Sequence, residues 1–329
     1  MISKLGVVGA GLWTKRLAGV LAKHTEILCS PIVEISALNT LKLANIFYVP
    51  IVIRVGFRPG QLRPKATYLD LICLIYLLFK KDIVFYWTGS DVDRTRKMFD
   101  SYGLPSRLWS IPVARLLVRK SRHCAAAPWL VDELASIGIE AYYLPFPSPT
   151  RTFEDIKIET LSMPKSFTVL TYIPDHNPSN YCGEEIISVA KELSHINFRI
   201  MGGLGEWCDS VPANVVFLGW IDPKVEYLAA SVLVRAVKHD ALGGTVREAL
   251  LCGRHVFYSF PHEHTIKIEV GQDPLIVSAD LKTHLEKIYT DHVSGALSLN
   301  TLGREWIQSN LTEEHLAKKA FDYFDGLRL

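Results

Sequence analysis

Residues 232–258 read VLVRAVKHDALGGTVREALLCGRHVFY and join two short apolar runs through a polar loop and a segment with helical spacing. The apolar runs at 232–236 and 255–258 are typical of buried strands, and the apolar positions of 245–252 repeat at helical intervals. A strand, a helix and a second strand in this order form a unit whose strands lie parallel in one sheet. The stretch therefore predicts a parallel sheet with helices packed on its faces.

The same alternation recurs on both sides of a proline-rich segment, LPFPSP at residues 144–149. Prolines disfavour a continued helix or a central strand, so we place a domain boundary there. A chain of 329 residues is also long for a single core. The prediction is an α/β protein with two doubly wound, Rossmann-like domains at 1–147 and 148–311. A helix at 312–329 is expected to pack back towards the N-terminal domain.

Periodicity and turn residues place the individual elements. In the first domain, strands are predicted at 5–8, 26–29, 46–55, 83–87, 123–127 and 141–144, with helices at 12–23, 68–79 and 128–137. In the second domain, further strands are predicted at 167–172, 198–201 and 215–218, further helices at 184–193 and 223–230, and three helical segments from residue 279 onward.

The composition is that of an ordinary globular protein, with 49% apolar and 21% charged residues. The six cysteines are scattered without a Cys-x-x-Cys pair and follow no secretory signal, which favours a reducing, cytoplasmic location. The most apolar run, residues 71–79, is far shorter than the roughly 20 residues that span a bilayer. We therefore expect a chain that does not cross a membrane.

Charge is divided unevenly along the chain. Residues 1–150 contain 19 Lys and Arg against 10 Asp and Glu, whereas the remainder contains 17 against 24. This asymmetry favours an anionic partner for the front half, such as nucleic acid, acidic lipid headgroups or a pyrophosphate. One basic and apolar segment resembles an amphipathic helix on an anionic membrane, although a packed helix with a solvated basic face fits it as well. Its basic residues are Arg107, Arg115, Arg119, Lys120 and Arg122.

A glycine turn follows the first predicted strand. GAGLWT at 9–14 offers Gly9, Gly11 and the neighbouring Trp13 to an anion or an acceptor molecule. It lacks the third glycine of a dinucleotide fingerprint, so we do not expect an NAD site. A tight turn whose residues serve only packing explains this sequence equally well.

A second turn, in FYWTGSDVDR at 85–94, places Gly89, Ser90 and Asp91 just past a strand, at the edge where parallel sheets bind ligands. Asp91 or Asp93 could instead cap the following helix. The pair also resembles an Asp-x-Asp metal motif, but three residues match such a motif too easily by chance. The histidines have no metal-ligand spacing, and we expect a mechanism without a metal or other cofactor.

The loop and helix of the opening stretch resemble the donor-binding region of GT-B fold glycosyltransferases, in particular the retaining enzymes of family 4. That family carries an acid and a glutamate separated by seven residues, and DALG at 240–243 with EALLCG at 248–253 matches it. FLGWIDPKVEYLAAS at 217–231 and VLTYIPDHNPSNYCGEEIISVAKEL at 169–193 are similar to other family segments in order and spacing. The resemblance implies a GT-B fold, in which two Rossmann-like domains face a cleft.

The resemblance also implies roles for single residues. Gly243 and Gly244 would let a diphosphate approach the helix that starts at Thr245, where the helix dipole favours anions. Glu248 would bind a ribose hydroxyl, and Asp240 would bind hydroxyls of the transferred sugar. Because Asp240 replaces the usual Glu, the identity of the donor sugar stays open.

The chain lacks two basic residues that the family usually has in this domain. The usual Arg and Lys are absent from YIPDHNPSNYCGE at 172–184. The nearest basic side chains are Arg235, Lys238 and His239, so we expect these to stabilise the leaving phosphates.

The predicted function is the transfer of a sugar from a nucleotide diphosphate sugar of the UDP or GDP type to a glycan or lipid-linked acceptor. The resemblance implies retention of configuration without a metal, with the leaving phosphate helping to deprotonate the acceptor, while Asp91 is the candidate that orients the acceptor. A peripheral position on the inner face of a membrane fits the basic first domain, and no nucleic-acid partner is expected. Two alternatives are a sugar-nucleotide epimerase of the same fold and a non-catalytic subunit that binds a nucleotide sugar.

Overall fold

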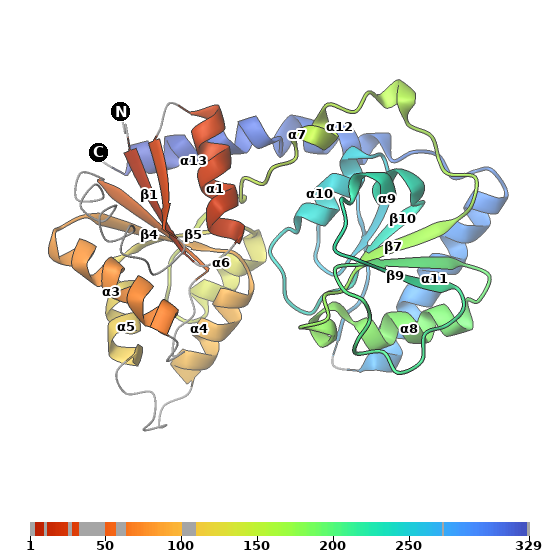
Figure 1. The fold of residues 1–329 in the computed structure, drawn as a ribbon, viewed down its shortest axis with the longest axis horizontal. Helices are drawn as coiled ribbons and strands as arrows, with labels where there is room; N and C mark the ends of the chain where they lie inside the picture. Colours follow the sequence, from red (N-terminus) through yellow and green to blue (C-terminus); the bar gives the residue numbers. More distant parts are fainter. Residues whose placement is uncertain are drawn as a thin grey trace. The chain divides into compact units, whose positions relative to one another are not determined.

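The structure is a computed structural model that describes residues 4–9, 12–25, 28–32, 50–56, 64–100, 110–271 and 273–327. The chain divides into two compact units. The first contains Met1–Pro149, Asp240–Leu242 and Glu313–Leu329, and the second contains Thr150–His239 and Gly243–Thr312. Each unit is a parallel sheet with helices packed on it (Figure 1). The predicted α/β class, with two parallel sheets, is confirmed.

The described strands of the first unit are β1 (Lys4–Gly9), β2 (Leu28–Ile32), β3 (Ile51–Val55), β4 (Asp82–Trp87), β5 (Arg122–Ala125) and β6 (Tyr142–Tyr143). They form a parallel sheet in the order β2-β1-β3-β4-β5-β6. β3 and β4 are central and almost wholly buried, which suits their branched and aromatic side chains. The strand order reverses between β1 and β3, so the carboxyl edge there is a switch point of the sheet.

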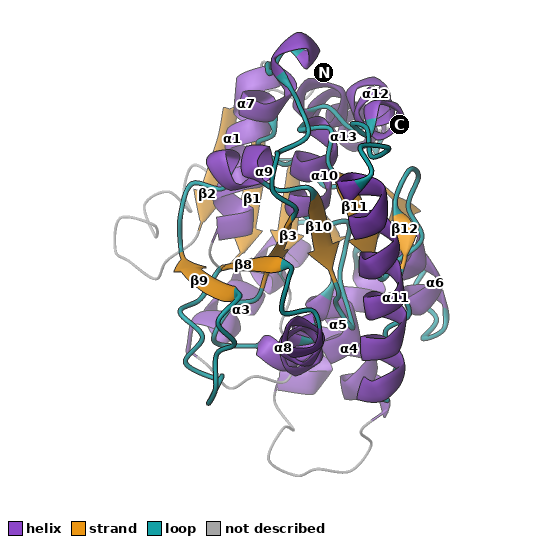
Figure 2. Ribbon diagram, turned by 90° about the vertical axis from the view of Figure 1, so that its right-hand side faces the viewer, coloured by secondary structure: helices purple, strands orange, loops and turns teal. Residues whose placement is uncertain are grey.

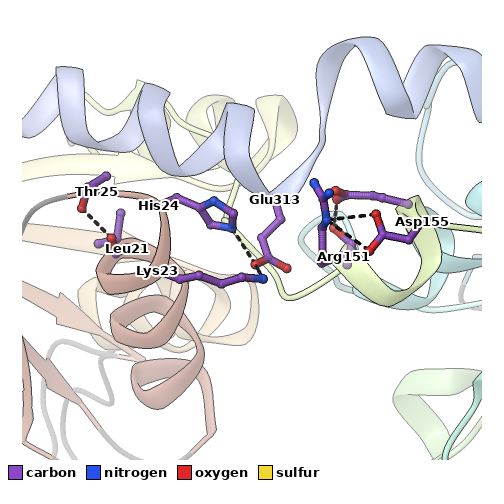
Figure 3. A network of polar contacts seen from close by, with 9 residues as sticks. Leu21, Lys23, His24, Thr25, Arg151, Asp155 and Glu313 are labelled. Carbon is purple, nitrogen blue, oxygen red and sulfur yellow. Dashed lines mark hydrogen bonds and ion pairs between the residues drawn. The ribbon is translucent and has the colours of Figure 1, made fainter.

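The described helices of the first unit are α1 (Leu12–His24), α3 (Pro64–Leu78), α4 (Ser90–Asp100), α5 (Ser110–Lys120), α6 (Pro128–Ala135) and α13 (Glu313–Gly326). α1 packs against α13, and α3 packs against α5 (Figure 1). α13 places Phe324 in the core of this unit. Its buried Glu313 accepts a hydrogen bond from Lys23 Nζ at 2.7 Å and lies 2.8 Å from His24 Nε2 (Figure 3). The last helix is therefore part of the first unit.

The second unit contains β7 (Thr168–Tyr172), β8 (Asn197–Met201), β9 (Val215–Gly219), β10 (Val232–Arg235), β11 (His255–Tyr258) and β12 (Ile266–Lys267). Its helices are α7 (Arg151–Glu154), α8 (Gly183–Glu192), α9 (Lys224–Ala229), α10 (Gly244–Leu251), α11 (Pro274–Val293) and α12 (Thr301–Asn310), with short 3-10 turns η2 (Ile158–Thr160) and η3 (Pro178–Tyr181). The sheet is parallel, in the order β12-β11-β10-β7-β8-β9. α8 packs against α11, and α10 packs against α12 (Figure 2).

The predicted elements differ from the observed ones mainly at their ends. β11 occupies the predicted 255–258, and α10 begins one residue before the predicted 245. α11 begins at Pro274 instead of at the predicted residue 279, because Asp273 caps it by accepting a hydrogen bond from Leu275 N at 2.9 Å. The predicted strand at 46–55 corresponds to β3 from Ile51 onward, and residues 46–49 lie outside the described residues.

The second sheet reverses its strand order between β7 and β10. The chain leaves β7 towards α8 on one side of this point and leaves β10 towards α10 on the other. Open α/β sheets bind ligands outside the carboxyl ends of their strands at such switch points. The carboxyl ends of β7 and β10 are therefore the place in this unit to look for a ligand site.

Candidate functional site

The start of α10 follows directly on the loop that leaves β10. Gly243 is the N-cap residue, with extended backbone at φ −64° and ψ 144°, and Gly244 is the first helical residue. The first N–H groups of a helix have no carbonyl partner within it and carry partial positive charge. Thr245 adds a hydroxyl oxygen that is buried without a hydrogen-bond partner. This arrangement suits an anion with several acceptor oxygens.

Glu248 points back along α10 towards the start of the helix. A Cβ atom at position 244 would lie 3.3 Å from Glu248 Oε1, so the glycine there leaves room for the carboxylate. Tyr227 Oη donates a hydrogen bond to Glu248 Oε2 at 2.8 Å. Burial, the negative charge of Glu248 and this hydrogen bond raise the pKa of the Tyr227 phenol well above its usual value. The phenol therefore stays protonated and fixes one carboxylate oxygen, while Glu248 keeps partial exposure.

Arg235 ends β10 and packs against two aromatic rings. Its guanidinium carbon lies 4.8 Å from the ring centroid of Tyr181 and 5.6 Å from that of Tyr172. Contacts of this kind contribute about 0.5–2 kcal/mol and hold the cation in place. The charge of Arg235 lowers the pKa of the Tyr227 phenol, whereas the charge of Glu248 raises it. Arg235 lies at the carboxyl end of β10, the strand that leads through a loop to α10 and Glu248.

The loop after β10 is tied to η3 through its backbone. Lys238 N donates to Asn180 O at 2.8 Å, and Asn180 Nδ2 donates to His239 O at 3.3 Å. Lys238 Nζ lies 3.7 Å from Oε1 of Glu185, a carboxylate that is 7% exposed in the first turn of α8. The ammonium of Lys238 thus balances a buried acid beside the start of α8. Two of the predicted cationic residues are therefore held next to the connection between β7 and α8.

The same sheet edge carries two residues that the sequence analysis did not select. Asp175 follows β7 and accepts hydrogen bonds from the N–H groups of the loop after β8, at 2.8 Å from Leu204 and 2.9 Å from Gly205. Trp220 follows β9, is 73% exposed, and meets the Tyr172 ring edge-on at 5.9 Å between centroids. No spacing in the sequence indicates the Asp175 contacts, whereas Trp220 comes two residues after the predicted strand at 215–218, and an aromatic residue at such a strand end is a sequence signal for a ligand contact.

Asp240 lies in the segment Asp240–Leu242, which belongs to the first unit. There Trp129 Nε1 donates a hydrogen bond to Asp240 O at 2.8 Å. Gly89, two residues after β4, has a φ of +117°, and a Cβ atom on it would lie 3.1 Å from Ala241 N. Glycine is required at this position because a side chain would be strained by its backbone angle and would press on the segment. The two predicted acids, Asp240 and Glu248, are thus supported by contacts in different units.

Asp91 is 2% exposed and binds the backbone of its own turn. Its carboxylate accepts hydrogen bonds from Thr88 N at 3.0 and 3.1 Å and from Val92 N at 3.1 Å. Asp91 lies inside the first turn of α4 and is not its N-cap, so it fixes the turn that precedes the helix. Asp93 instead pairs with Lys97 Nζ at 2.7 Å. Within the described ranges, no three His, Cys, Asp or Glu side chains gather as a possible metal site. The neighbouring Ser90 is exposed at the start of α4.

Gly9 ends β1 in a tight position. A Cβ atom on it would lie 2.4 Å from Thr14 Oγ1 and 2.5 Å from Val55 O, so close packing accounts for this glycine. Trp13 is 40% exposed, and its ring meets the Phe146 ring edge-on at 5.4 Å. It offers an aromatic surface near the carboxyl end of β1. Gly11 lies outside the described residues.

Arg115, Arg119 and Lys120 of the predicted basic segment lie on α5, and Arg122 begins β5. Arg107 lies outside the described residues. Leu117 and Val118 are buried in the core of the first unit, so this part of the helix packs on the protein. Leu116 is 44% exposed, and Arg119 and Lys120 at the end of the helix are exposed too. Among the helices of the described ranges, none combines the length and the apolar character needed to cross a bilayer.

Comparisons with solved structures show the fold. Sucrose-phosphate synthase from Thermosynechococcus elongatus has a TM-score of 0.67 to this chain at 13% identity, covering 99% of each chain. HepE from Anabaena, in complex with UDP and glucose, has a TM-score of 0.63 at 10% identity, covering 98% of this chain and 100% of the other. An alpha-glucosyltransferase, in complex with UDP and a 13-mer DNA containing a central A:G mismatch, has a TM-score of 0.60 at 11% identity, covering 97% and 99%. No protein-family model and no curated protein sequence matches the chain.

The chain has the GT-B fold, with one Rossmann-like sheet in each unit. The match extends over nearly the whole length of these neighbours, so both units correspond to parts of that fold. Identities of 10–13% show the architecture alone.

Proposed function

We propose that the protein is a glycosyltransferase that moves a sugar from a nucleotide diphosphate sugar to a glycan or lipid-linked acceptor. One observation carries the proposal. The buried cation Arg235 ends β10 at the switch point of the second sheet, and the helix that follows this strand, α10, begins with glycines and carries Glu248, which Tyr227 fixes. A diphosphate needs hydrogen-bond donors and positive charge, and a ribose needs a fixed acceptor. Two structures of similar fold contain UDP, which supports a UDP-type donor.

In this proposal, the diphosphate binds the N–H groups at the start of α10 and the hydroxyl of Thr245. Arg235 balances the charge that grows on the leaving phosphates, with Lys238 and His239 beside it. The reaction retains the anomeric configuration and uses no metal. As the bond between the anomeric carbon and the leaving phosphate breaks, the acceptor oxygen bonds to that carbon from the same face, and a phosphate oxygen takes the proton of the acceptor hydroxyl. Asp240 accepts hydrogen bonds from hydroxyls of the transferred sugar.

The exposed ring of Trp220 is our candidate surface for the nucleotide base, since aromatic rings stack on bases of any type. The acceptor is assigned to the carboxyl edge of the first unit, where Ser90 and Trp13 are exposed. Asp91 serves this site by fixing the turn between β4 and α4, and its hydrogen bonds to Thr88 and Val92 support that positioning role.

A ligand screen followed by a turnover assay tests the proposal. Thermal unfolding is measured with UDP, GDP, ADP and their sugars, and a nucleotide at 100 times its dissociation constant should stabilise the fold by about 2.7 kcal/mol. The nucleotide sugar that binds is then incubated with glycan and lipid-linked acceptors, with and without EDTA. Transfer to an acceptor that persists in EDTA is expected. Conversion of the donor sugar without an acceptor would identify an epimerase, and binding without any turnover would identify a non-catalytic subunit.

A further inference from the structure

An apolar ridge runs along the outer side of α3. Leu71, Ile75 and Leu78 follow one another at intervals of four and three residues, which places them on one helix face. They are 49%, 39% and 74% exposed, and Phe79 just after the helix is 57% exposed. The inner face of α3 is also apolar, because Leu69, Ile72, Cys73 and Tyr76 are buried in the core. Since a surface helix normally carries polar residues on its outer face, this ridge indicates a contact with something apolar.

Basic residues border the ridge. α3 and α5 pack side by side, and each ends just before its strand, β4 or β5, which are neighbours in the sheet (Figure 1). The two helix ends therefore lie at the same edge of the sheet. Segments 64–81 and 110–122 contain seven Lys and Arg residues and one acid, Asp70, which pairs with the buried Arg54 at 3.2 Å. The basic residues at the helix ends are Lys80, Lys81, Arg119, Lys120 and Arg122, the last lying 3.9 Å from Asp82.

A hollow of about 830 Å³ opens beside this basic edge. Arg119 and Arg122 line it together with Tyr142 and Tyr323, whose rings stack with centroids 4.7 Å apart. The basic side chains thus border space that a phosphate-bearing headgroup can enter.

We propose that the ridge of α3 and the basic residues at the ends of α3 and α5 form a surface that docks onto an anionic lipid bilayer. Apolar side chains enter the interfacial layer, and the Lys and Arg residues contact acidic headgroups, each contributing to the affinity. The protein lies on the bilayer through this surface. α5 contributes charge and Leu116, because Leu117 and Val118 are in the core. The proposal goes beyond the proposed sugar transfer and does not depend on it.

Vesicle flotation of the whole protein tests the proposal. Vesicles of phosphatidylcholine with 30% phosphatidylglycerol are compared with vesicles of phosphatidylcholine alone, in low and in high salt. Wild-type protein should bind the anionic vesicles and be released by salt. Neutralising two charges in Arg119→Gln with Lys120→Gln should lower the partition coefficient about thirtyfold. Leu78→Ser with Phe79→Ser removes two exposed apolar side chains and should lower the partition coefficient about tenfold or more.

Matched controls lie in the second unit. Val225→Ser with Leu275→Ser removes two apolar side chains that are 69% and 78% exposed. Lys165→Gln with Lys287→Gln removes two exposed charges. Both control variants should bind the vesicles like wild type, and thermal unfolding verifies that every variant is folded.

Three outcomes would overturn the proposal. The first is equal binding of wild type to neutral and anionic vesicles, and the second is equal losses in the test and control variants. The third is a change of oligomeric state in the Leu78 and Phe79 variant without any loss of vesicle binding, which would make the ridge a contact between protein chains. Because no nucleotide is present in the assay, its result does not depend on whether sugar transfer occurs.

Discussion

Replacing Glu248 by Gln tests the proposed ribose contact at a single group. Tyr227 Oη donates to Oε2 at 2.8 Å, and we propose that the ribose binds through Oε1, which faces Gly244. Gln keeps the shape and a carbonyl oxygen for Tyr227 but removes the charge. A hydrogen bond to a charged group contributes about 1.5–3 kcal/mol and a neutral one about 0.5–1.5 kcal/mol. The difference of about 1–1.5 kcal/mol predicts a dissociation constant for UDP about five- to tenfold higher.

Isothermal titration calorimetry measures this constant, and thermal unfolding measures the stability of each variant. Glu184→Gln is the matched control, because Glu184 is an exposed acid in the first turn of α8 at the same sheet edge. We expect it to leave the affinity for UDP unchanged. Tyr227→Phe keeps the charge of Glu248 but removes the donor that fixes it. This variant should lose about 1.5–3 kcal/mol of stability and should weaken UDP binding less than Glu248→Gln does.

Glu248 does not bind the ribose if Glu248→Gln unfolds like wild type and binds UDP with the same affinity. Glu248 would then serve only as the partner of the buried Tyr227 phenol. Equal weakening by Glu184→Gln would show that the effect is one of net charge at this sheet edge and not of a direct contact.

Two further predictions concern the first unit. Gly9→Ala should destabilise the protein by about 1–3 kcal/mol, because the added methyl group would lie 2.5 Å from Val55 O. In α1, the methyl group of Gly19→Ala would meet no atom within 4 Å, so this variant should be more stable than wild type by up to about 1 kcal/mol. Urea unfolding measures the stability of both glycine variants, and equal effects of the two substitutions would contradict the packing explanation. Burial lowers the pKa of His123 from 6.5 to about 4. As the pH falls below 6.5, His123 binds a proton in the unfolded chain before it does in the folded chain. The free energy of unfolding should therefore fall by about 3 kcal/mol between pH 6.5 and pH 4. His123→Asn should flatten this slope in urea unfolding at a series of pH values, and a parallel slope would refute the assignment.

The elements of the fold could be predicted because their signals are local. The strand at 255–258 is a short apolar run between turn residues, and the structure has the same bounds. The start of α11 was placed too late although its signal is present, since Asp273 followed by Pro274 is a common way to begin a helix. The start of this helix is therefore encoded locally, in its capping residue and the proline that follows it.

The candidate site could be predicted only in part, because its contacts join distant segments. The glycines and Glu248 lie in one short stretch, and its resemblance to the GT-B donor-binding segment implies an anion site at the glycines and a ribose contact at Glu248. The hydrogen bond from Tyr227 to Glu248 and the aromatic rings around Arg235 come from other elements, and no spacing indicates them. The basic segment at α5 was predicted from its composition, but composition does not tell which of its apolar residues face the core.

The position of α13 has a consequence for how the chain folds during synthesis. Phe324 and its neighbours on this helix complete the core of the first unit, and Asp240–Leu242 also belong to that unit. Domains of a growing chain generally fold as units once their residues have been made. The second unit ends at Thr312, so all of its residues are made before those of α13. The core of the first unit can therefore be completed only after the whole of the second unit and α13 have been made.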